Sequence, residues 1–192
     1  MYERLRRSCA PSLHVVLRER WDGWAHLFRG HVLPRQATDR AVRFISALRG
    51  KVPPCVIAAV LNTWFNGWCT SRRFQEPEQP CRILTEHEGA DSIEHYACCS
   101  GAWESAARHL GISARPRSLA RFLGVAPAPG DSAVLSALHM YIVRSLFNAV
   151  RAGELLPSRT LEDCSARYRE RLRFLCLLHR PLRALRLPGA PS

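Results

Sequence analysis

Apolar residues recur every three or four positions along most of the chain, which is the period of an α-helix with one buried face. Residues that cap or stop helices bound these stretches: Thr38 and Ser158 can cap, and Gly50 can stop. We therefore expect an all-α fold, a multi-helix bundle of about six or seven helices. The expected helices cover residues 13–28, 38–48, 54–68, 91–110, 118–123, 134–150 and 158–176.

One segment interrupts the helical pattern. Residues 69–90 contain Pro77, Pro80 and Gly89 among charged residues, which indicates a loop. We expect this loop and the helix after it to form a short Cys/His loop-helix knuckle in the middle of the bundle. A second break, Pro127-Ala128-Pro129-Gly130, is the best internal boundary. The sequence thus predicts a helical region over 1–126 that contains the knuckle (about 69–110), a C-terminal helical pair over 131–182 and a basic flexible tail over 183–192.

Two aspartates stand where predicted helices begin, and we assign each the role of N-cap. Asp91-Ser92-Ile93-Glu94 fits a capping box, in which Asp91 accepts from the first-turn amides while Glu94 reaches back. Asp131 is expected to cap the long helix that follows it. The helix that begins at Asp91 is expected to continue to Leu110 and to end at Gly111.

The chain shows neither a membrane-spanning segment nor a secretion signal. The most apolar stretch, Ala133 to Val150, contains His139, Arg144 and Asn148, which are expensive to place in lipid. No apolar run follows the N-terminal Met-Tyr-Glu-Arg-Leu-Arg-Arg, so no signal peptide is visible. The sequence therefore predicts a nuclear or cytoplasmic protein, and its eight cysteines are not expected to form a disulfide framework.

Cysteines and histidines cluster with metal-ligand spacing in only one place. His95 and Cys99 are four residues apart on a predicted helix, so their side chains project from one face. That spacing is half of a zinc site, and Cys81 begins the upstream half. A Cys-x-x-Cys turn requires a second cysteine at position 84, where the chain has Leu84.

Several residues can supply the fourth ligand. His87 gives the set Cys81, His87, His95 and Cys99, with Cys98 as a substitute for Cys99. Cys69 is a third candidate, although twelve residues separate it from Cys81. The alternative is that no metal binds and that Cys98 and Cys99 pack as small hydrophobic residues. Zn²⁺, if bound, is expected to be structural, because nothing beside the cluster indicates a water-activating base or a pocket.

The charge favours a polyanionic partner. Net charge is +12, and 27 of the 28 basic residues are arginine, a skew that a GC-rich genome also produces. Seven acids against one base give residues 76–104 a charge of −6, so any nucleic-acid surface should lie on the flanking helices. The candidate phosphate contacts are Arg72, Arg73, Arg167, Arg169, Arg171 and Arg173, for which a solvated helix face is the alternative.

The aromatic residues have more than one interpretation. Trp21, Trp24, Trp64 and Trp68 recur at helical spacing, which is typical of a hydrophobic core. The alternatives are a base-stacking platform or an apolar patch left exposed by a missing partner.

The Cys/His segment and the residues just before it resemble a known family. The segment Gly67-Trp68-Cys69-Thr70-Ser71-Arg72-Arg73-Phe74, then Cys81, then Asp91-Ser92-Ile93-Glu94-His95-Tyr96-Ala97-Cys98-Cys99 resembles the zinc-binding segment C-terminal to the reverse transcriptase core of non-LTR retrotransposons, of the dinoflagellate type. The family pattern is a cysteine pair, a spacer, a Glu-His step and a final cysteine. Cys81, Glu94, His95 and Cys99 match it, and Leu84 departs from it.

The resemblance implies a non-catalytic remnant of such an element. In that family, polymerisation depends on paired aspartates upstream of this segment, and the chain contains no adjacent Asp-Asp pair. An endonuclease would need clustered carboxylates with a lysine or histidine, and we find none. We expect sequence-nonspecific binding of RNA or DNA, with an upstream reverse transcriptase domain as a further partner. The alternative is an inert or protein-interaction helical module with a decayed metal site.

Overall fold

The fold is all-α. The computed structural model describes residues 12–24, 34–185 and 187–188, and in these it contains helices and two isolated β-bridges but no strand. Residues 25–28 at the end of the first predicted helix, and residues 186 and 189–192 of the predicted tail, lie outside the described residues. The helices are α2 (Leu13–Gly23), α3 (Pro34–Leu48), α4 (Pro54–Trp64), α5 (Ser71–Phe74), α6 (Ile93–Tyr96), α7 (Ser100–Leu110), α8 (Leu119–Phe122), α9 (Ala133–Arg151), α10 (Leu161–Leu178) and α11 (Arg180–Arg183).

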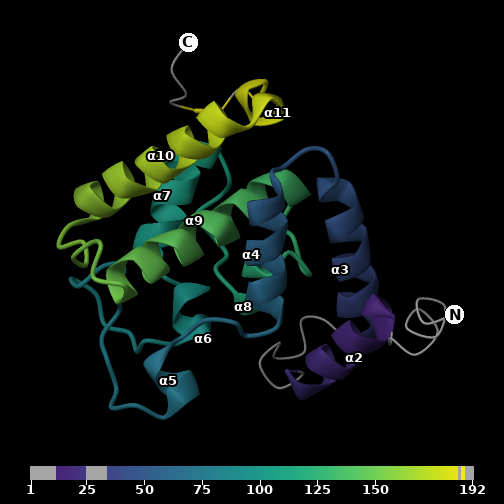
Figure 1. Ribbon diagram of the computed structural model, residues 1–192, viewed down its shortest axis with the longest axis horizontal. Helices are drawn as coiled ribbons and strands as arrows, with labels where there is room; N and C mark the ends of the chain where they lie inside the picture. The colour runs from purple at the N-terminus through teal and green to yellow at the C-terminus, as the bar shows by residue number, and fades with distance from the viewer. Residues whose placement is uncertain (1–11, 25–33, 186, 189–192) are drawn as a thin grey trace, which may run out of the picture.

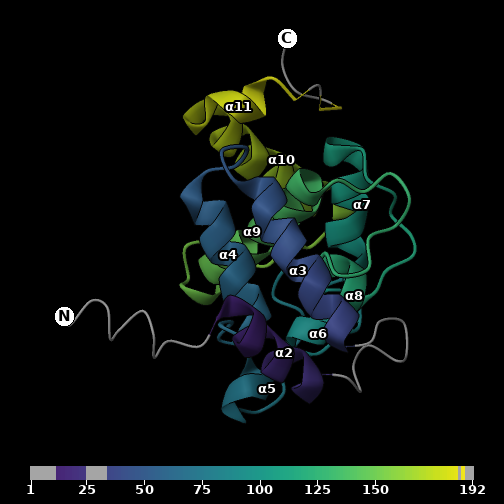
Figure 2. The same cartoon turned by 90° about the vertical axis from the view of Figure 1, so that its right-hand side faces the viewer.

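Helix α9 is the centre of the bundle. It packs against α4 and α3 on one side and against α7 and α10 on the other, as Figures 1 and 2 show. One hydrophobic cluster runs from Leu17 to Leu182, so both predicted regions, 1–126 and 131–182, contribute to the same core. The knuckle lies at one end of α9, where α5 and α6 meet the long loop between them.

By length and composition α9 is also the one described helix that would be long and apolar enough to cross a membrane. In the bundle, 61% of its apolar window is buried inside the protein. Core helices of globular proteins have this composition, because they are apolar on most of their surface.

Helix boundaries differ from those expected in three places. Helix α3 begins at Pro34, and Thr38 is buried inside it rather than at its cap. Helix α4 ends at Trp64, before Asn66 adopts a positive φ of 53°. The single helix predicted for 91–110 is two helices, α6 and α7, separated at residues 97–99.

Three predicted N-caps are also wrong. The side chains that accept a first-turn amide belong to Ser92 in α6, Ser132 in α9 and Thr160 in α10. Asp91 and Asp131, one residue before the true caps, are buried instead in ion pairs with arginine. Ser158 does not cap α10. Its backbone amide donates to the carbonyl of residue 83, and its carbonyl accepts from the amide of residue 85, both in the knuckle loop.

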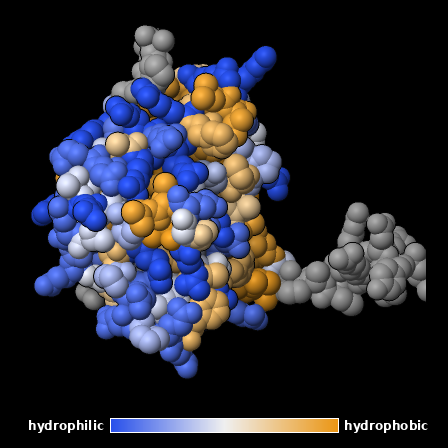
Figure 3. All heavy atoms as spheres, turned by 60° about the vertical axis from the view of Figure 1, so that its left-hand side comes forward, coloured by the Kyte–Doolittle hydropathy of each residue, from blue (hydrophilic) through white to orange (hydrophobic). Residues whose placement is uncertain are grey.

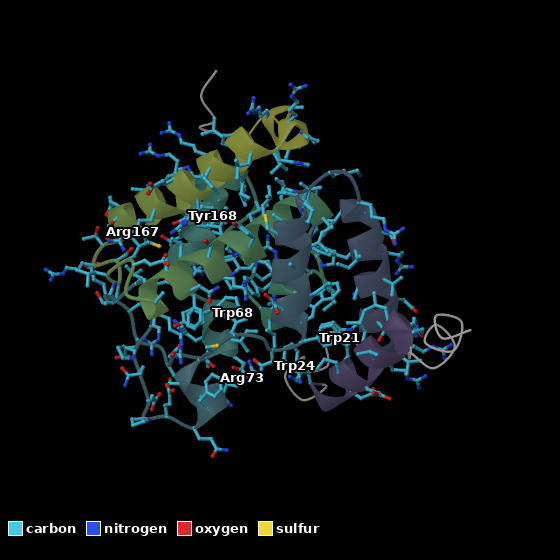
Figure 4. The ribbon with its side chains drawn as sticks, viewed as in Figure 1. Trp21, Trp24, Trp68, Arg73, Arg167 and Tyr168 are labelled. Atoms are coloured by element: carbon cyan, nitrogen blue, oxygen red, sulfur yellow. The ribbon has the colours of Figure 1, made fainter. Side chains whose placement is uncertain are left out.

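The tryptophans are core residues. Trp21, Trp64 and Trp68 have no exposed surface, and Trp24 is 7% exposed, so they form neither an exposed patch nor a stacking platform. Trp68 matters most for the knuckle, because its ring packs on Tyr96 of α6 and on Phe147 of α9. Figure 4 shows Trp68 at the centre of the molecule, between the long helices and α5.

A buried ion pair fixes the loop that leads into α9. Arg121 donates to both carboxylate oxygens of Asp131, over 2.7 and 2.8 Å, and both side chains are almost fully buried. Burial alone would raise the pKa of Asp131, but the hydrogen bonds from Arg121 and the Ala128 amide outweigh it and lower that pKa. The Arg121 guanidinium also lies 4.4 Å from the centre of the Trp103 ring.

His139 of α9 is buried in its neutral form. Its Nδ1 lies 3.0 Å from the Tyr168 hydroxyl, and its Nε2 has no hydrogen-bond partner among the described residues. Burial, assisted by the charge of Arg121, lowers the pKa of His139 to about 3. Only one of the two ring nitrogens of this buried histidine, Nδ1, therefore has a hydrogen-bond partner among the described residues.

We predict that His139 makes the fold sensitive to acid. An unfolded histidine takes up a proton below its ordinary pKa of about 6.5, whereas the folded one does not until about pH 3. Its contribution is therefore fully present above pH 6.5 and declines as pH falls towards 3, by roughly 1.4 kcal/mol for each pH unit.

Urea denaturation at a series of pH values measures this decline. Substitution His139→Gln should flatten the slope of stability against pH in that interval, whatever it does to stability at neutral pH. Equal slopes in the parent and the variant would contradict the assignment.

Candidate metal centre

Four potential metal ligands converge in the knuckle. One ligand atom from each of Cys81, His87, His95 and Cys99 lies within 4.8 Å of the other three. Two thiols and two imidazoles are a donor set that zinc prefers, and bonds of about 2.0–2.3 Å in a tetrahedral site place the ligand atoms about 3.3–3.8 Å apart. The cluster can hold a metal ion after a contraction of up to about 1.0–1.5 Å at its widest pair.

The four ligands come from three pieces of backbone. Cys81 and His87 lie in the loop, His95 in the one-turn helix α6, and Cys99 at the residue before α7. The break between α6 and α7 therefore has a consequence for the site, because it lets Cys99 leave the helical path. Cys98, by contrast, is exposed, and neither it nor Cys69 belongs to the cluster.

His87 supplies the fourth candidate ligand. Its Nε2 lies 3.1 Å from Nε2 of His95, and the two rings are stacked with their centroids 4.9 Å apart. Nδ1 of His87 is buried without a hydrogen-bond partner among the described residues. Because the two imidazoles converge, the cluster has four candidate ligands rather than three.

The two thiols are coupled to each other. A hydrogen bond from Cys99 and, after it, the neighbouring His95 lower the pKa of the Cys81 thiol. The same hydrogen bond and burial raise the pKa of Cys99. The cluster therefore favours one thiolate, which is the form that binds metal.

Leu84 takes part in the turn that begins at Cys81, but its side chain lies outside the metal-ligand cluster. Its backbone amide donates to the sulfur of Cys81 over 3.5 Å, which holds the turn closed. Its side chain points into the core, where a Cβ added to Gly101 would lie 2.7 Å from Cδ2. Position 84 therefore lies outside the cluster, and the fourth candidate ligand is His87, one of the alternatives that the sequence offered.

A buried carboxylate holds the knuckle together. Asp91, with no exposed surface, accepts hydrogen bonds from the Ser71 amide at 2.9 Å, from Nε of Arg82 at 2.9 Å and from the Tyr96 hydroxyl at 2.8 Å. Tyr96 in turn accepts from the Arg82 amide. These bonds join α5, the loop segment after Cys81, and α6.

Gly89 makes room for a ligand. A Cβ built at this position would lie 1.9 Å from the ring of His95, much closer than atoms in contact allow. The loop closes beside it, since Pro80 and Ala90 form an antiparallel bridge and the Asp91 amide donates to the Gln79 carbonyl over 2.8 Å. Nothing in a spacing pattern marks Gly89 or Asp91, because their roles depend on what packs against them.

The six predicted phosphate-binding arginines do not form one surface. Arg72 and Arg73 lie on α5 at one end of the molecule, and the other four lie on α10 at the opposite side, as the labelled Arg73 and Arg167 in Figure 4 show. Arg72 pairs with Glu94 and Arg167 with Asp163, while Arg73 donates to the Trp68 carbonyl.

The remaining arginines of α10 point two ways. Arg169 and Arg173 lie near Arg108, and the three charges, after burial, lower the pKa of His109 between them. Arg171 faces α9 instead and lines a cavity with Arg144. None of Arg169, Arg171 and Arg173 forms an ion pair with a described residue.

Comparison with known proteins adds no family. No protein-family model matches the chain, and neither does any curated protein or solved structure. The resemblance to the post-polymerase segment of non-LTR retrotransposons therefore stays a prediction from the residues.

We predict that Asp91 stabilises the metal-free fold. Substitution Asp91→Asn leaves Arg82 without its carboxylate and replaces one acceptor oxygen by an NH₂ donor that faces other donors, so the free energy of unfolding should fall by about 3 kcal/mol. Chemical denaturation in the presence of a chelator measures it.

The matched control is Asp163→Asn. Asp163 also pairs with an arginine, but its side chain is 38% exposed, and the loss should stay below about 1 kcal/mol. An equal loss of unfolding free energy in the two variants would show that the hydrogen bonds of Asp91 do not hold the knuckle together.

Proposed function

We propose that the chain is a non-catalytic helical module that carries one structural Zn²⁺ and binds RNA or DNA without sequence specificity. The observation that carries the proposal is the convergence of Cys81, His87, His95 and Cys99 on one point. Four protein ligands fill a tetrahedral shell and leave no open position for water, which is typical of structural rather than catalytic zinc. Zinc would supply a cross-link between the loop and the start of α7.

The charge supports the nucleic-acid part of the proposal. Arg169 and Arg173, which form no ion pair within the described part of the chain, extend a positive surface from α10 to Arg108 of α7. The acidic knuckle loop meets the other end of this region, at Ser158, before α10 begins. Guanidinium groups without carboxylate partners are available for phosphate oxygens. Such contacts position a nucleic-acid strand and carry no sequence information.

The resemblance to the post-polymerase segment agrees with this assignment. A zinc-binding, arginine-rich segment that follows a polymerase needs no active site of its own. A reverse transcriptase domain upstream, as in non-LTR retrotransposons, is accordingly the partner we propose.

A second candidate is a protein-interaction module. Phe174, Leu177 and Leu178 of α10 are 52–67% exposed and lie on one helix face. Figure 3 shows apolar surface towards the C-terminal end of the molecule, continuing as a band down one side. Contiguous apolar surface of this kind is typical of a protein contact.

We predict the zinc content of the chain and of variants at the site. The purified chain should contain about one equivalent of zinc, and the double variant His95→Ala, Cys99→Ala should contain none. Gly89→Ala should also lose most of its zinc affinity, because the added methyl group displaces the His95 ring. Metal analysis and competition with a chromogenic chelator measure both.

Gly23→Ala is the matched control for the glycine. A Cβ at Gly23 meets no atom within 4 Å, and the variant should bind zinc like the parent. A parent chain that takes up no zinc from a zinc-containing buffer would refute the site.

Salt dependence tests the nucleic-acid proposal. The affinity of the zinc-loaded chain for single-stranded RNA and duplex DNA should fall steeply as salt rises, because counterions are released. On duplex DNA, the double variant Arg169→Ala, Arg173→Ala should lower the slope of log affinity against log salt by about one for each arginine that touches a phosphate.

Fluorescence anisotropy over a salt series gives both slopes. Arg117→Ala is the control, since Arg117 is already paired with Glu104 over 3.1 Å. Absence of binding at low salt, or binding indifferent to salt, would favour the interaction module instead.

A further inference from the structure

A polar cavity of about 290 Å³ lies between α9, the turn that follows it and α10, away from the metal centre. Two arginines line it, Arg144 from α9 and Arg171 from α10. The other lining residues carry hydroxyl, amide and carboxylate groups or small side chains: Tyr141, Ser145, Asn148, Ala149, Ala152 and Glu154.

The arginines of this cavity lack acidic partners in the described part of the chain. Neither Arg144 nor Arg171 forms an ion pair there, and Nε of Arg144 is buried with no hydrogen-bond partner. Arg144 is half-buried, and burial lowers its pKa. A buried donor without an acceptor costs free energy that a bound anion would recover.

The surrounding groups extend the donor set. The Tyr141 hydroxyl lies close enough to both guanidinium groups for their charges to act on it, and Cys55 is its neighbour on α4. Ser145 and Asn148 add a hydroxyl and an amide from the next turn of α9. The one carboxylate, Glu154, is exposed, so two guanidinium charges oppose a single solvated negative charge.

We propose that this cavity binds a phosphate monoester. Two planar guanidinium groups with hydroxyl and amide donors match the three terminal oxygens of a phosphate dianion better than the two free oxygens of a phosphodiester. The cavity volume is roughly ten times a water molecule's share of the liquid, so it admits the phosphate with part of the group that carries it. A free nucleotide and the phosphorylated end of a nucleic-acid strand both present this chemistry.

The site is separate from the proposed backbone contacts. Those contacts involve Arg169 and Arg173, on the face of α10 that meets α7, whereas Arg171 meets α9. Binding of a small phosphate ester is therefore independent of nonspecific nucleic-acid binding, and either can fail without the other.

Calorimetric titration of the full-length chain with adenosine monophosphate tests the proposal. Saturable binding at one site is expected, with adenosine, which lacks the phosphate, binding at least about tenfold more weakly. Arg144→Gln and Arg171→Gln should each weaken adenosine monophosphate binding by about tenfold or more. Arg169→Gln, which removes the same charge from the other face of α10, should leave it nearly unchanged.

Two oligonucleotides of one sequence, with and without a 5′-phosphate, distinguish the sources. A preference for the phosphorylated strand that disappears in Arg171→Gln would place a strand end in the cavity, and equal binding of the two strands with retained nucleotide binding would leave the free nucleotide as the ligand. The proposal is overturned if no titration saturates at millimolar nucleotide, if adenosine binds as well as its phosphate, or if Arg169→Gln weakens binding as much as Arg171→Gln.

Discussion

The knuckle depends on the burial of one carboxylate. Asp91 gathers an amide from α5, a guanidinium from the loop and a hydroxyl from α6, three elements with little apolar surface of their own. Trp68 and Tyr96 then connect this polar centre to α9 by stacking. The hydrogen bonds hold Arg82 and Tyr96, the neighbours in sequence of Cys81 and His95, on one carboxylate, so the same contact that closes the knuckle also brings these two candidate ligands together.

Much of the architecture follows from the sequence. Helical periodicity predicted the class of fold, because apolar residues at spacings of three and four leave few other ways to build a core. The ligand set Cys81, His87, His95 and Cys99 was also among the predicted combinations, and these are the residues that converge. The spacing of His95 and Cys99 predicted their proximity, although Cys99 lies outside the helix rather than on it.

The errors share a physical cause. Asp91 and Asp131 have the residue type of an N-cap and stand beside one, so local pattern cannot separate aspartate from the following serine. What separates them is a distant arginine, Arg82 or Arg121, that draws the carboxylate into the interior. Gly89 and the two faces of α10 are likewise set by tertiary contacts. At α6 and α9 local rules thus place the start of the helix to within a residue, and an ion pair with an arginine nine or ten residues away decides which side chain is the cap.

Leu84 and Gly101 limit each other. The leucine fills space above the one position of α7 that has no side chain, so a methyl group at 101 would require the end of the Leu84 side chain to move. Position 84 thus belongs to the core and Cys81, three residues earlier, to the candidate metal centre, so one short turn ties the two together.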